Sequence, residues 1–237
     1  MTKILITNDD GIRSDGILRL ASAAAEFGEV WVVAPEDERS SMSHSITLHK
    51  SFEVWDSPFP VPGVHAFSCS GTPGDCVRIG VLNVVPGKPD YILSGINYGY
   101  NAATDLQYSA TAGAALEGAF QGIPSAAFSE DAGPVHEVTD HSLREILGAI
   151  LQKPPGAGKI WNVNFPGCSL KEWRGILWDR KVSTDCYFRD TYSQELLPSG
   201  HLSCRVIGTR NFSAEEGTDL RALYDHFVSI GTVKNLS

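Results

Sequence analysis

The chain contains 237 residues, of which 42% are hydrophobic and 20% charged, and this composition excludes a disordered or low-complexity protein. The length is sufficient for a large hydrophobic core. The 28 acidic and 19 basic residues give a formal net charge of −9, which argues against binding to a nucleic acid polymer, because such binding depends on Lys and Arg contacts to phosphates. A small phosphorylated ligand remains compatible with this charge if a metal ion supplies positive charge.

The cysteines and the N-terminal segment indicate the compartment. The five cysteines are scattered and form no Cys-x-x-Cys pair, so we expect buried, reduced thiols and no disulfide framework or structural zinc site. The apolar N-terminal run reaches Asp9 and Asp10 before it is long enough for a signal peptide, and no segment is apolar for long enough to span a bilayer. We therefore expect a cytoplasmic protein that does not bind membranes.

The first part of the chain predicts a strand–helix–strand unit. Short apolar runs at residues 4–6 and 30–33 are typical of buried strands, and residues 15–27 carry apolar side chains at helical spacing. Gly28 follows this segment as a helix stop. Such a unit predicts a right-handed crossover between parallel strands.

Strands and helices continue to alternate in the middle of the chain. Residues 46–55 alternate in polarity and are expected to form part of an antiparallel extension, and residues 71–75 are expected to open a helical stretch. The later predicted elements are strands at 91–93, 123–128 and 160–164, with helices at 111–120 and 141–151 between them.

After Pro166 the pattern changes. Residues 173–190 and 201–209 indicate strands or hairpin arms, and residues 219–224 indicate a final helix. We therefore expect one α/β domain over residues 1–237, with a mostly parallel sheet flanked by helices and a β-hairpin-rich C-terminal extension from about residue 168 to 237.

Polar side chains follow several of the predicted strands. Asn8, Asp9 and Asp10 come directly after the first strand, Ser40 lies in the loop after the second, and Asn97 follows the strand at 91–93. Ligands of open parallel sheets bind beyond the carboxyl ends of the strands, so these loops are expected to meet in one crevice.

The donor atoms in this crevice suit a particular kind of metal ion. Carboxylate, hydroxyl and carboxamide oxygens are hard ligands, which favour Mg²⁺ or Mn²⁺ over zinc. Taken alone, Asn8 to Gly11 is better explained as an ordinary turn, which its residue types favour. The chain lacks the motifs of dinucleotide-binding dehydrogenases, Walker A proteins and α/β-hydrolases, which leaves metal-assisted hydrolysis.

Two further polar groups admit both a structural and a functional interpretation. Ser109 and Thr111 open the alanine-rich helix, where they are suited either to anion binding or to ordinary N-capping. His44 lies within a serine-rich loop, where it is either a hydrogen-bonded loop residue or part of the site.

Several short motifs together resemble the SurE (survival protein E) family of nucleotidases. They occur in the family's order and are dense in the first half of the chain: ILITNDDG at 4–11, VVAP at 32–35, RS at 39–40, SIT at 45–47, GTP at 71–73, SGIN at 94–97 and YSAT at 108–111. Thinner matches follow, at residues 162–166, 218–219 and 228–230.

This resemblance implies a Rossmann-like fold and a phosphatase that depends on one divalent metal ion, Mg²⁺ or Mn²⁺. The implied substrates are nucleoside 5′- and 3′-monophosphates, and the implied assembly is a homodimer or homotetramer that exchanges a C-terminal segment. By position, the implied metal ligands are Asp9, Asp10, Ser40 and Asn97, with Asp9 or Asp10 also acting on the attacking water, and Asn8, Ser109 and Thr111 fall where the family holds phosphate.

The chain departs from the family pattern at two positions near this site. Ser41 and Ala110 stand where family members usually have glycine, and their Cβ atoms are expected to narrow the phosphate cradle. These departures keep a second hypothesis open, a nucleotide-binding or regulatory module without hydrolysis. A third is a general acid phosphatase or short-chain exopolyphosphatase on the same fold.

Overall fold

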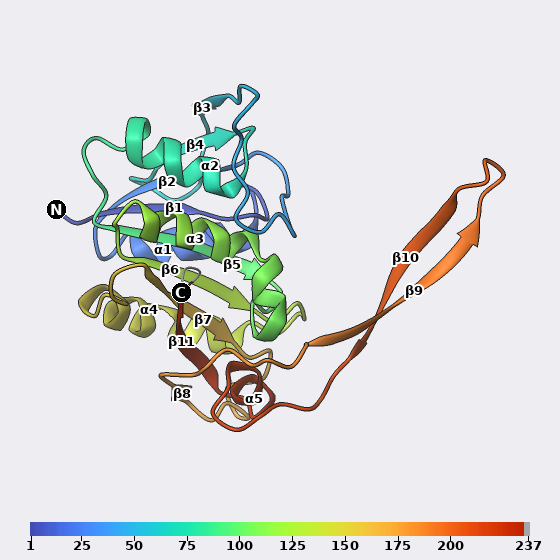
Figure 1. Ribbon diagram of the computed structural model, residues 1–237. Helices are drawn as coiled ribbons and strands as arrows, with labels where there is room; N and C mark the ends of the chain where they lie inside the picture. Colours follow the sequence, from blue (N-terminus) through green and yellow to red (C-terminus); the bar gives the residue numbers. More distant parts are fainter. Residues whose placement is uncertain (235–237) are drawn as a thin grey trace.

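The structure, a computed structural model, describes residues 1–234. Its centre is a nine-stranded sheet in the order β3-β4-β2-β1-β5-β6-β7-β11-β8. A second sheet of two strands, β9 and β10, extends away from this body (Figure 1). The architecture confirms the predicted α/β fold with a mostly parallel sheet and a hairpin-bearing C-terminal part.

Six neighbouring strands of the large sheet are parallel: β1 (Lys3–Thr7), β2 (Glu29–Pro35), β4 (His65–Cys69), β5 (Tyr91–Tyr98), β6 (Ser125–Glu130) and β7 (Lys159–Phe165). The remaining strands lie at the two edges of the sheet. At one edge, β3 (Val54–Asp56) pairs antiparallel with β4; at the other, β11 (Val228–Lys234) pairs antiparallel with β7 and parallel with the short β8 (Ile176–Leu177). The C-terminal strand thus returns to the main sheet.

Helices cover both faces of the sheet because its central strands are apolar on both sides. Ile4 and Ile6 of β1 pack in one core with α1 (Asp15–Ala24) and α4 (Glu137–Gln152). Leu5, between them, packs in the opposite core with α2 (Pro73–Ile79). This alternation of side chains along β1 supplies both hydrophobic layers.

The remaining helical segments are α3 (Ala110–Phe120), α5 (Asp219–Tyr224), a π-helical turn at Gly80–Val84 and a 3₁₀ helix, η2, at Ala103–Tyr108. The helix α3 lies on the same face as α2 and is buried almost all round. Gly113 allows the serine-rich loop to approach it, because a Cβ atom at Gly113 would lie 2.5 Å from the Ser43 carbonyl oxygen.

The start of α2 confirms the predicted helical opening at residues 71–75. Thr72 and Asp75 form a reciprocal capping box, in which each side chain accepts from the other's backbone N–H. The Asp75 carboxylate also accepts from the backbone N–H of Thr47 at 2.9 Å. This contact holds part of the 46–55 segment against the helix.

Some element boundaries differ from the sequence expectation. Of the predicted extension at 46–55, only residues 54 and 55 belong to a strand, β3, and the preceding part is held by contacts such as that of Thr47 with Asp75. Segment 173–190 contains only the short β8 and the beginning of β9, and the chain between them forms loops. The sequence analysis missed β4, and α4 begins four residues earlier than expected, at Glu137.

The predicted hairpin arms form β9 (Phe188–Leu196) and β10 (Leu202–Arg210), which pair antiparallel over their whole length. Every residue of both strands is exposed. The hairpin projects away from the body of the protein (Figure 1). The hairpin therefore has no hydrophobic layer within its own chain.

The states of the cysteines and the lengths of the helices can be compared with the predicted cytoplasmic location. All five thiols are free, but only Cys69, Cys76 and Cys168 are buried; Cys204 lies exposed on β10, so the expectation of buried thiols is wrong there. Across residues 1–234, no helix combines the length and apolarity needed to cross a bilayer. The cytoplasmic location stays a prediction.

Candidate active site

A cavity of about 320 Å³ opens at the carboxyl ends of the central strands. It lies beside β1 and β5, where the strand order reverses direction, which is the position expected for a ligand site in such a sheet. Among the predicted site residues, Asp9, Ser40, Asn97 and Ser109 line this cavity. Four loops that are distant in sequence therefore meet at one place.

Asp9 is the buried carboxylate of the site, with 3% of its surface exposed. Its Oδ1 accepts a short hydrogen bond from the Thr111 hydroxyl at the first turn of α3. Burial is the main cause that raises the pKa of Asp9 to about 7; the hydrogen bond from Thr111 opposes the rise, and the neighbouring charge of Asp10 adds to it. The negative charge of Asp9 is thus held where little in the protein compensates it.

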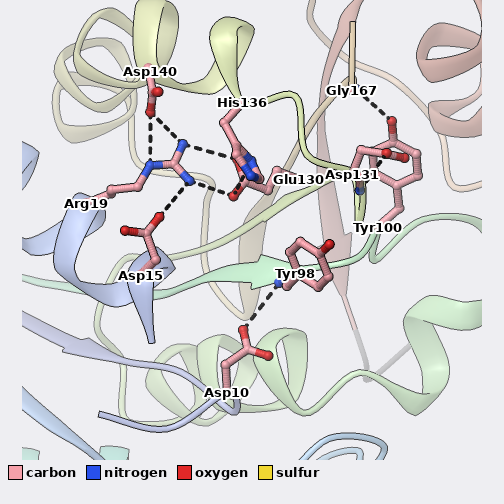
Figure 2. Close-up of polar contacts among 11 residues, drawn as sticks. Asp10, Asp15, Arg19, Tyr98, Tyr100, Glu130, Asp131, His136, Asp140 and Gly167 are labelled. Atoms are coloured by element: carbon pink, nitrogen blue, oxygen red, sulfur yellow. Dashed lines mark hydrogen bonds and ion pairs between the residues drawn. The ribbon is translucent and has the colours of Figure 1, made fainter. Parts of the chain in front are cut away.

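Asp10 and Asn97 are fixed by the end of β5. The Oδ2 atom of Asp10 accepts from the backbone N–H of Tyr98 at 3.3 Å (Figure 2). Burial raises the pKa of Asp10, and the charges of Glu38 and Glu130 act in the same direction. The Asn97 amide nitrogen donates to the Gly99 carbonyl at 2.7 Å, so its side-chain oxygen is the atom left to act as a ligand.

The serine-rich loop, residues 40–45, is held by hydrogen bonds at both ends. The backbone N–H of Arg39 donates to the Asp9 carbonyl at 2.7 Å, which places Ser40 beside the carboxylates. Ser40 is exposed, and its hydroxyl donates to Glu38 at 2.8 Å. At the other end, His44 Nε2 lies 2.8 Å from Glu117 Oε2 on α3, so His44 is a hydrogen-bonded loop residue outside the cavity lining.

Ser41 shows why glycine suits its position. Its φ is 61°, in the left-handed region that a side chain disfavours. Ser41 lines the cavity next to Ser40. Ala110, the other departure, is fully buried as the first residue of α3.

The opening of α3 supports the N-cap interpretation of Ser109 and places Thr111 behind the cavity. The Ser109 Oγ accepts from the Ala112 N–H at 3.0 Å, and Ser109 also lines the cavity. Thr111 is completely buried and gives its hydroxyl hydrogen to Asp9. It is therefore placed to orient Asp9, and its predicted contact with phosphate stays a prediction.

Asn8 lies beneath the same loop. It is fully buried, and its Nδ2 donates to the Gly11 carbonyl at 2.9 Å and to Ser14 Oγ at 2.8 Å, bonds that brace the turn after β1. Its Oδ1 is buried without a hydrogen-bond partner. The turn and the site are thus built from the same residues.

The charges around the cavity fit a divalent cation. The lining residues, all of which belong to the described part of the chain, include three aspartates and no Lys, Arg or His. Within residues 1–234 no three His, Cys, Asp or Glu side chains converge as a metal cluster. Of the predicted metal ligands, Asp9, Ser40 and Asn97 line the cavity and Asp10 does not; carboxylate, hydroxyl and amide oxygens are the donors that Mg²⁺ and Mn²⁺ prefer.

Several cavity residues were not among the predicted site residues. Tyr98, Asp105 and Tyr108 come from segments flanking predicted ones, and Phe188 and Asp190 come from the base of the hairpin, far along the chain. No motif in the sequence marks these hairpin residues as part of the site.

Asn101, which also lines the cavity, is held by the strand at residues 159–165. Its backbone N–H donates to Asn164 Oδ1 at 2.9 Å, and its carbonyl accepts from Asn162 Nδ2 at 2.9 Å. The two asparagines thus explain the Asn-Val-Asn motif as a brace for the loop that follows β5.

An ion-pair network around the buried Glu130 side chain lies at the edge of the site (Figure 2). The Glu130 side chain at the end of β6 is 5% exposed, and Arg19 Nη1 of α1 lies 2.6 Å from its Oε1. Arg19 also contacts Asp140 of α4 at 2.6 Å, and His136 Nδ1 lies 3.1 Å from Glu130. The Glu130 carbonyl accepts from the Gly99 N–H at 2.9 Å, which connects this network to the end of β5.

The fold and the site together define the class of protein. It is a doubly wound α/β protein with a cavity at the point where the strand order reverses, and oxygen-bearing side chains line that cavity. Comparison with known proteins places the chain within that class. The family model described as Survival protein SurE matches residues 4–186, and the chain belongs to the SurE family.

Individual relatives agree over nearly the full length. A protein named 5′-nucleotidase SurE from Synechococcus sp. (strain JA-3-3Ab) is 37% identical, with 96% of this chain and 89% of the relative covered. One named 5′-nucleotidase SurE 1 from Thermus thermophilus is 40% identical, with 98% and 91% covered. The crystal structure of the SurE protein from Aquifex aeolicus matches with a TM-score of 0.84 at 31% identity, covering 99% of this chain and 94% of that one.

Proposed function

We propose that this SurE protein is a nucleotidase that releases phosphate from nucleoside 5′- and 3′-monophosphates and depends on Mg²⁺ or Mn²⁺. The observation that carries the proposal is the cavity, which offers oxygen donors to a cation and no basic side chain to a phosphate. Relatives with the name 5′-nucleotidase match the chain over 96% to 98% of its length, which supports the nucleotide as substrate.

Asp9, Asp10, Ser40 and Asn97 would hold the metal ion. A bound divalent ion supplies the Lewis acidity and the positive charge that the cavity side chains lack. The hydrogen bond from Thr111 orients Asp9, and the N–H of Tyr98 orients Asp10, so both carboxylates are preorganised.

The chain's own groups then act on the substrate. One carboxylate, Asp9 or Asp10, orients the attacking water and accepts its proton. Ser109, the N-cap of α3 and part of the cavity lining, would contact the phosphate oxygens, and the helix N-terminus beside it would stabilise the negative charge that develops on them. Asn8 supports this arrangement by bracing the turn that carries Asp9 and Asp10.

Aromatic side chains around the cavity suit a nucleoside. Tyr98, Tyr108 and Phe188 line it with 58%, 65% and 44% of their surfaces exposed. Exposed aromatic faces stack on bases, and such stacking stabilises a complex by about 1–3 kcal/mol per base. A nucleotide is therefore expected to be a better substrate than a phosphate ester that places no ring against these side chains.

Phosphate release from a panel of nucleoside monophosphates tests the proposal. We expect release with Mg²⁺ or Mn²⁺, none with EDTA, and slower release from p-nitrophenyl phosphate than from nucleotides. Equal rates on all esters would favour a general acid phosphatase. Tight nucleotide binding without release under any metal, by a folded protein, would instead identify a non-hydrolytic binding module and direct attention to Ser41 and Ala110.

We further infer that the protein is a homodimer or homotetramer in which the hairpin packs against another copy. Tyr192 and Leu196 of β9 lie opposite Val206 and Leu202 of β10, so they form an apolar strip on one face. Their exposed fractions run from 53% to 72%. Because an isolated hairpin is only marginally stable in water, this strip is expected to be covered by a second copy.

Size-exclusion chromatography with light scattering tests this assembly. Replacing Leu196 and Leu202 by serine is expected to shift the protein to a smaller species, because it removes one apolar cross-strand pair from the strip. The matched control replaces exposed Leu82 by serine, which lies outside the hairpin and is expected to leave the mass unchanged. A wild-type protein that is monomeric at micromolar concentration would contradict the proposed packing of the hairpin against another copy.

A further inference from the structure

The mouth of the cavity carries two carboxylates that the proposed chemistry does not use. Asp105 belongs to the 3₁₀ helix η2 and Asp190 to the first arm of the hairpin, and both line the cavity together with Asp9. Burial raises the pKa of Asp105, and the charge of Asp190 raises it further. The two carboxylates therefore lie close enough to interact.

The positions of these aspartates separate the cavity into two electrostatic regions. Asp9 lies at the buried end, where it is 3% exposed, and with Asp10 it would balance the charge of a bound divalent cation. Asp105 is half-buried and Asp190 exposed, so they stand nearer the solvent. Since no Lys, Arg or His belongs to the lining, the charges of these two aspartates stay uncompensated at the mouth, within the described part of the chain.

We propose that Asp105 and Asp190 determine specificity by rejecting substrates with a second or third phosphate. This inference rests on the proposed function and deepens it. A monophosphate that enters phosphate-first has its one charged group at the buried end and its nucleoside between Tyr98, Tyr108 and Phe188. A nucleoside triphosphate or a polyphosphate brings further negative groups against the two aspartates.

The position of Asp105 and Asp190 at the mouth of the cavity also suits the binding of a nucleoside. Ribose hydroxyls and base amino groups are hydrogen-bond donors, and ionised carboxylates only accept. The two aspartates thus attract the neutral, donor-rich part of a nucleotide while they repel phosphate. On this basis the short-chain exopolyphosphatase alternative is disfavoured for this chain.

The test compares kcat/KM for a nucleoside monophosphate, the triphosphate of the same nucleoside and inorganic tripolyphosphate, at saturating free metal ion. The double variant Asp105→Asn/Asp190→Asn keeps the side-chain shape and removes both charges. We expect the monophosphate-to-triphosphate ratio, and the ratio to tripolyphosphate, to fall by about tenfold, because each charge contributes a few tenths of a kcal/mol to each phosphate charge across water. High salt is expected to reduce the difference between variant and wild type.

The control is Asp56→Asn, which removes an exposed carboxylate from β3 at the edge of the sheet, outside the cavity lining, and is expected to leave both ratios unchanged. Unchanged ratios in the double variant, with phosphate still released from the monophosphate, would overturn the role of Asp105 and Asp190. A wild-type protein that already hydrolyses triphosphate as fast as monophosphate would overturn it as well. Failure of the proposed function is distinguishable, because no substrate would then release phosphate with any metal ion.

Discussion

Replacing Asp9 by asparagine is expected to lower metal-dependent phosphate release by about 10³-fold, since a metal ion contributes several kcal/mol of transition-state stabilisation. Asparagine keeps an oxygen that can accept from Thr111, so the local hydrogen bond survives. It removes the buried charge, which the fold disfavours, as the pKa of about 7 indicates. The variant should therefore remain folded while it loses activity.

Two measurements separate loss of chemistry from loss of structure. Steady-state phosphate release gives the activity, and thermal unfolding without added metal gives the stability, which we expect to match or exceed that of the wild type. Asp56→Asn serves as the control for loss of one carboxylate and should retain full activity. Turnover by Asp9→Asn within tenfold of the wild type would remove Asp9 from the proposed metal site.

Replacing Arg19 by methionine is expected to destabilise the protein by about 3 kcal/mol, because it leaves the buried carboxylate of Glu130 without its main partner. The Arg19 guanidinium makes two hydrogen bonds to Glu130, at 2.6 and 3.2 Å, and is itself only 18% exposed. Urea denaturation at neutral pH measures the change in the free energy of unfolding.

The chain offers a control and a rescue for this prediction. Arg144 pairs with Glu26 on the surface, where the two side chains are 67% and 46% exposed, so Arg144→Met is expected to change stability by less than about 1 kcal/mol. Adding Glu130→Gln to Arg19→Met removes the stranded charge and should restore most of the lost stability. If Arg19→Met is no more destabilising than Arg144→Met, the pair with Glu130 contributes little.

The parallel core of the fold was predictable because its signals are local. The strands β1 and β2 contain short, continuous apolar runs between polar turns, and α1 buries apolar residues at helical spacing, Ile17, Leu20, Ala21 and Ala24. β4 escaped because its sequence, His-Ala-Phe-Ser-Cys, carries neither a continuous apolar run nor strict alternation. It is a strand because β2 lies beside it and supplies its hydrogen-bond partners.

The candidate site was predictable to the extent that its residues follow strand ends. Four of the predicted residues line one cavity, as expected, because the carboxyl ends of parallel strands share one edge of the sheet: Asp9, Ser40, Asn97 and Ser109. Thr111 was predicted near phosphate, whereas its hydroxyl is committed to Asp9, a pairing that depends on how α3 docks on the sheet.

The sequence by itself therefore determined the alternating strands and helices, the polar groups at the strand ends and, through its ordered motifs, the family. Only the tertiary structure decided which groups surround the substrate beyond the phosphate. Asp105 and Asp190 are 85 positions apart, and Phe188 reaches the cavity only because the hairpin base lies beside η2. Periodicity and turn chemistry act over a few residues, but the shape and charge of a cavity depend on packing between distant segments, which no local pattern records.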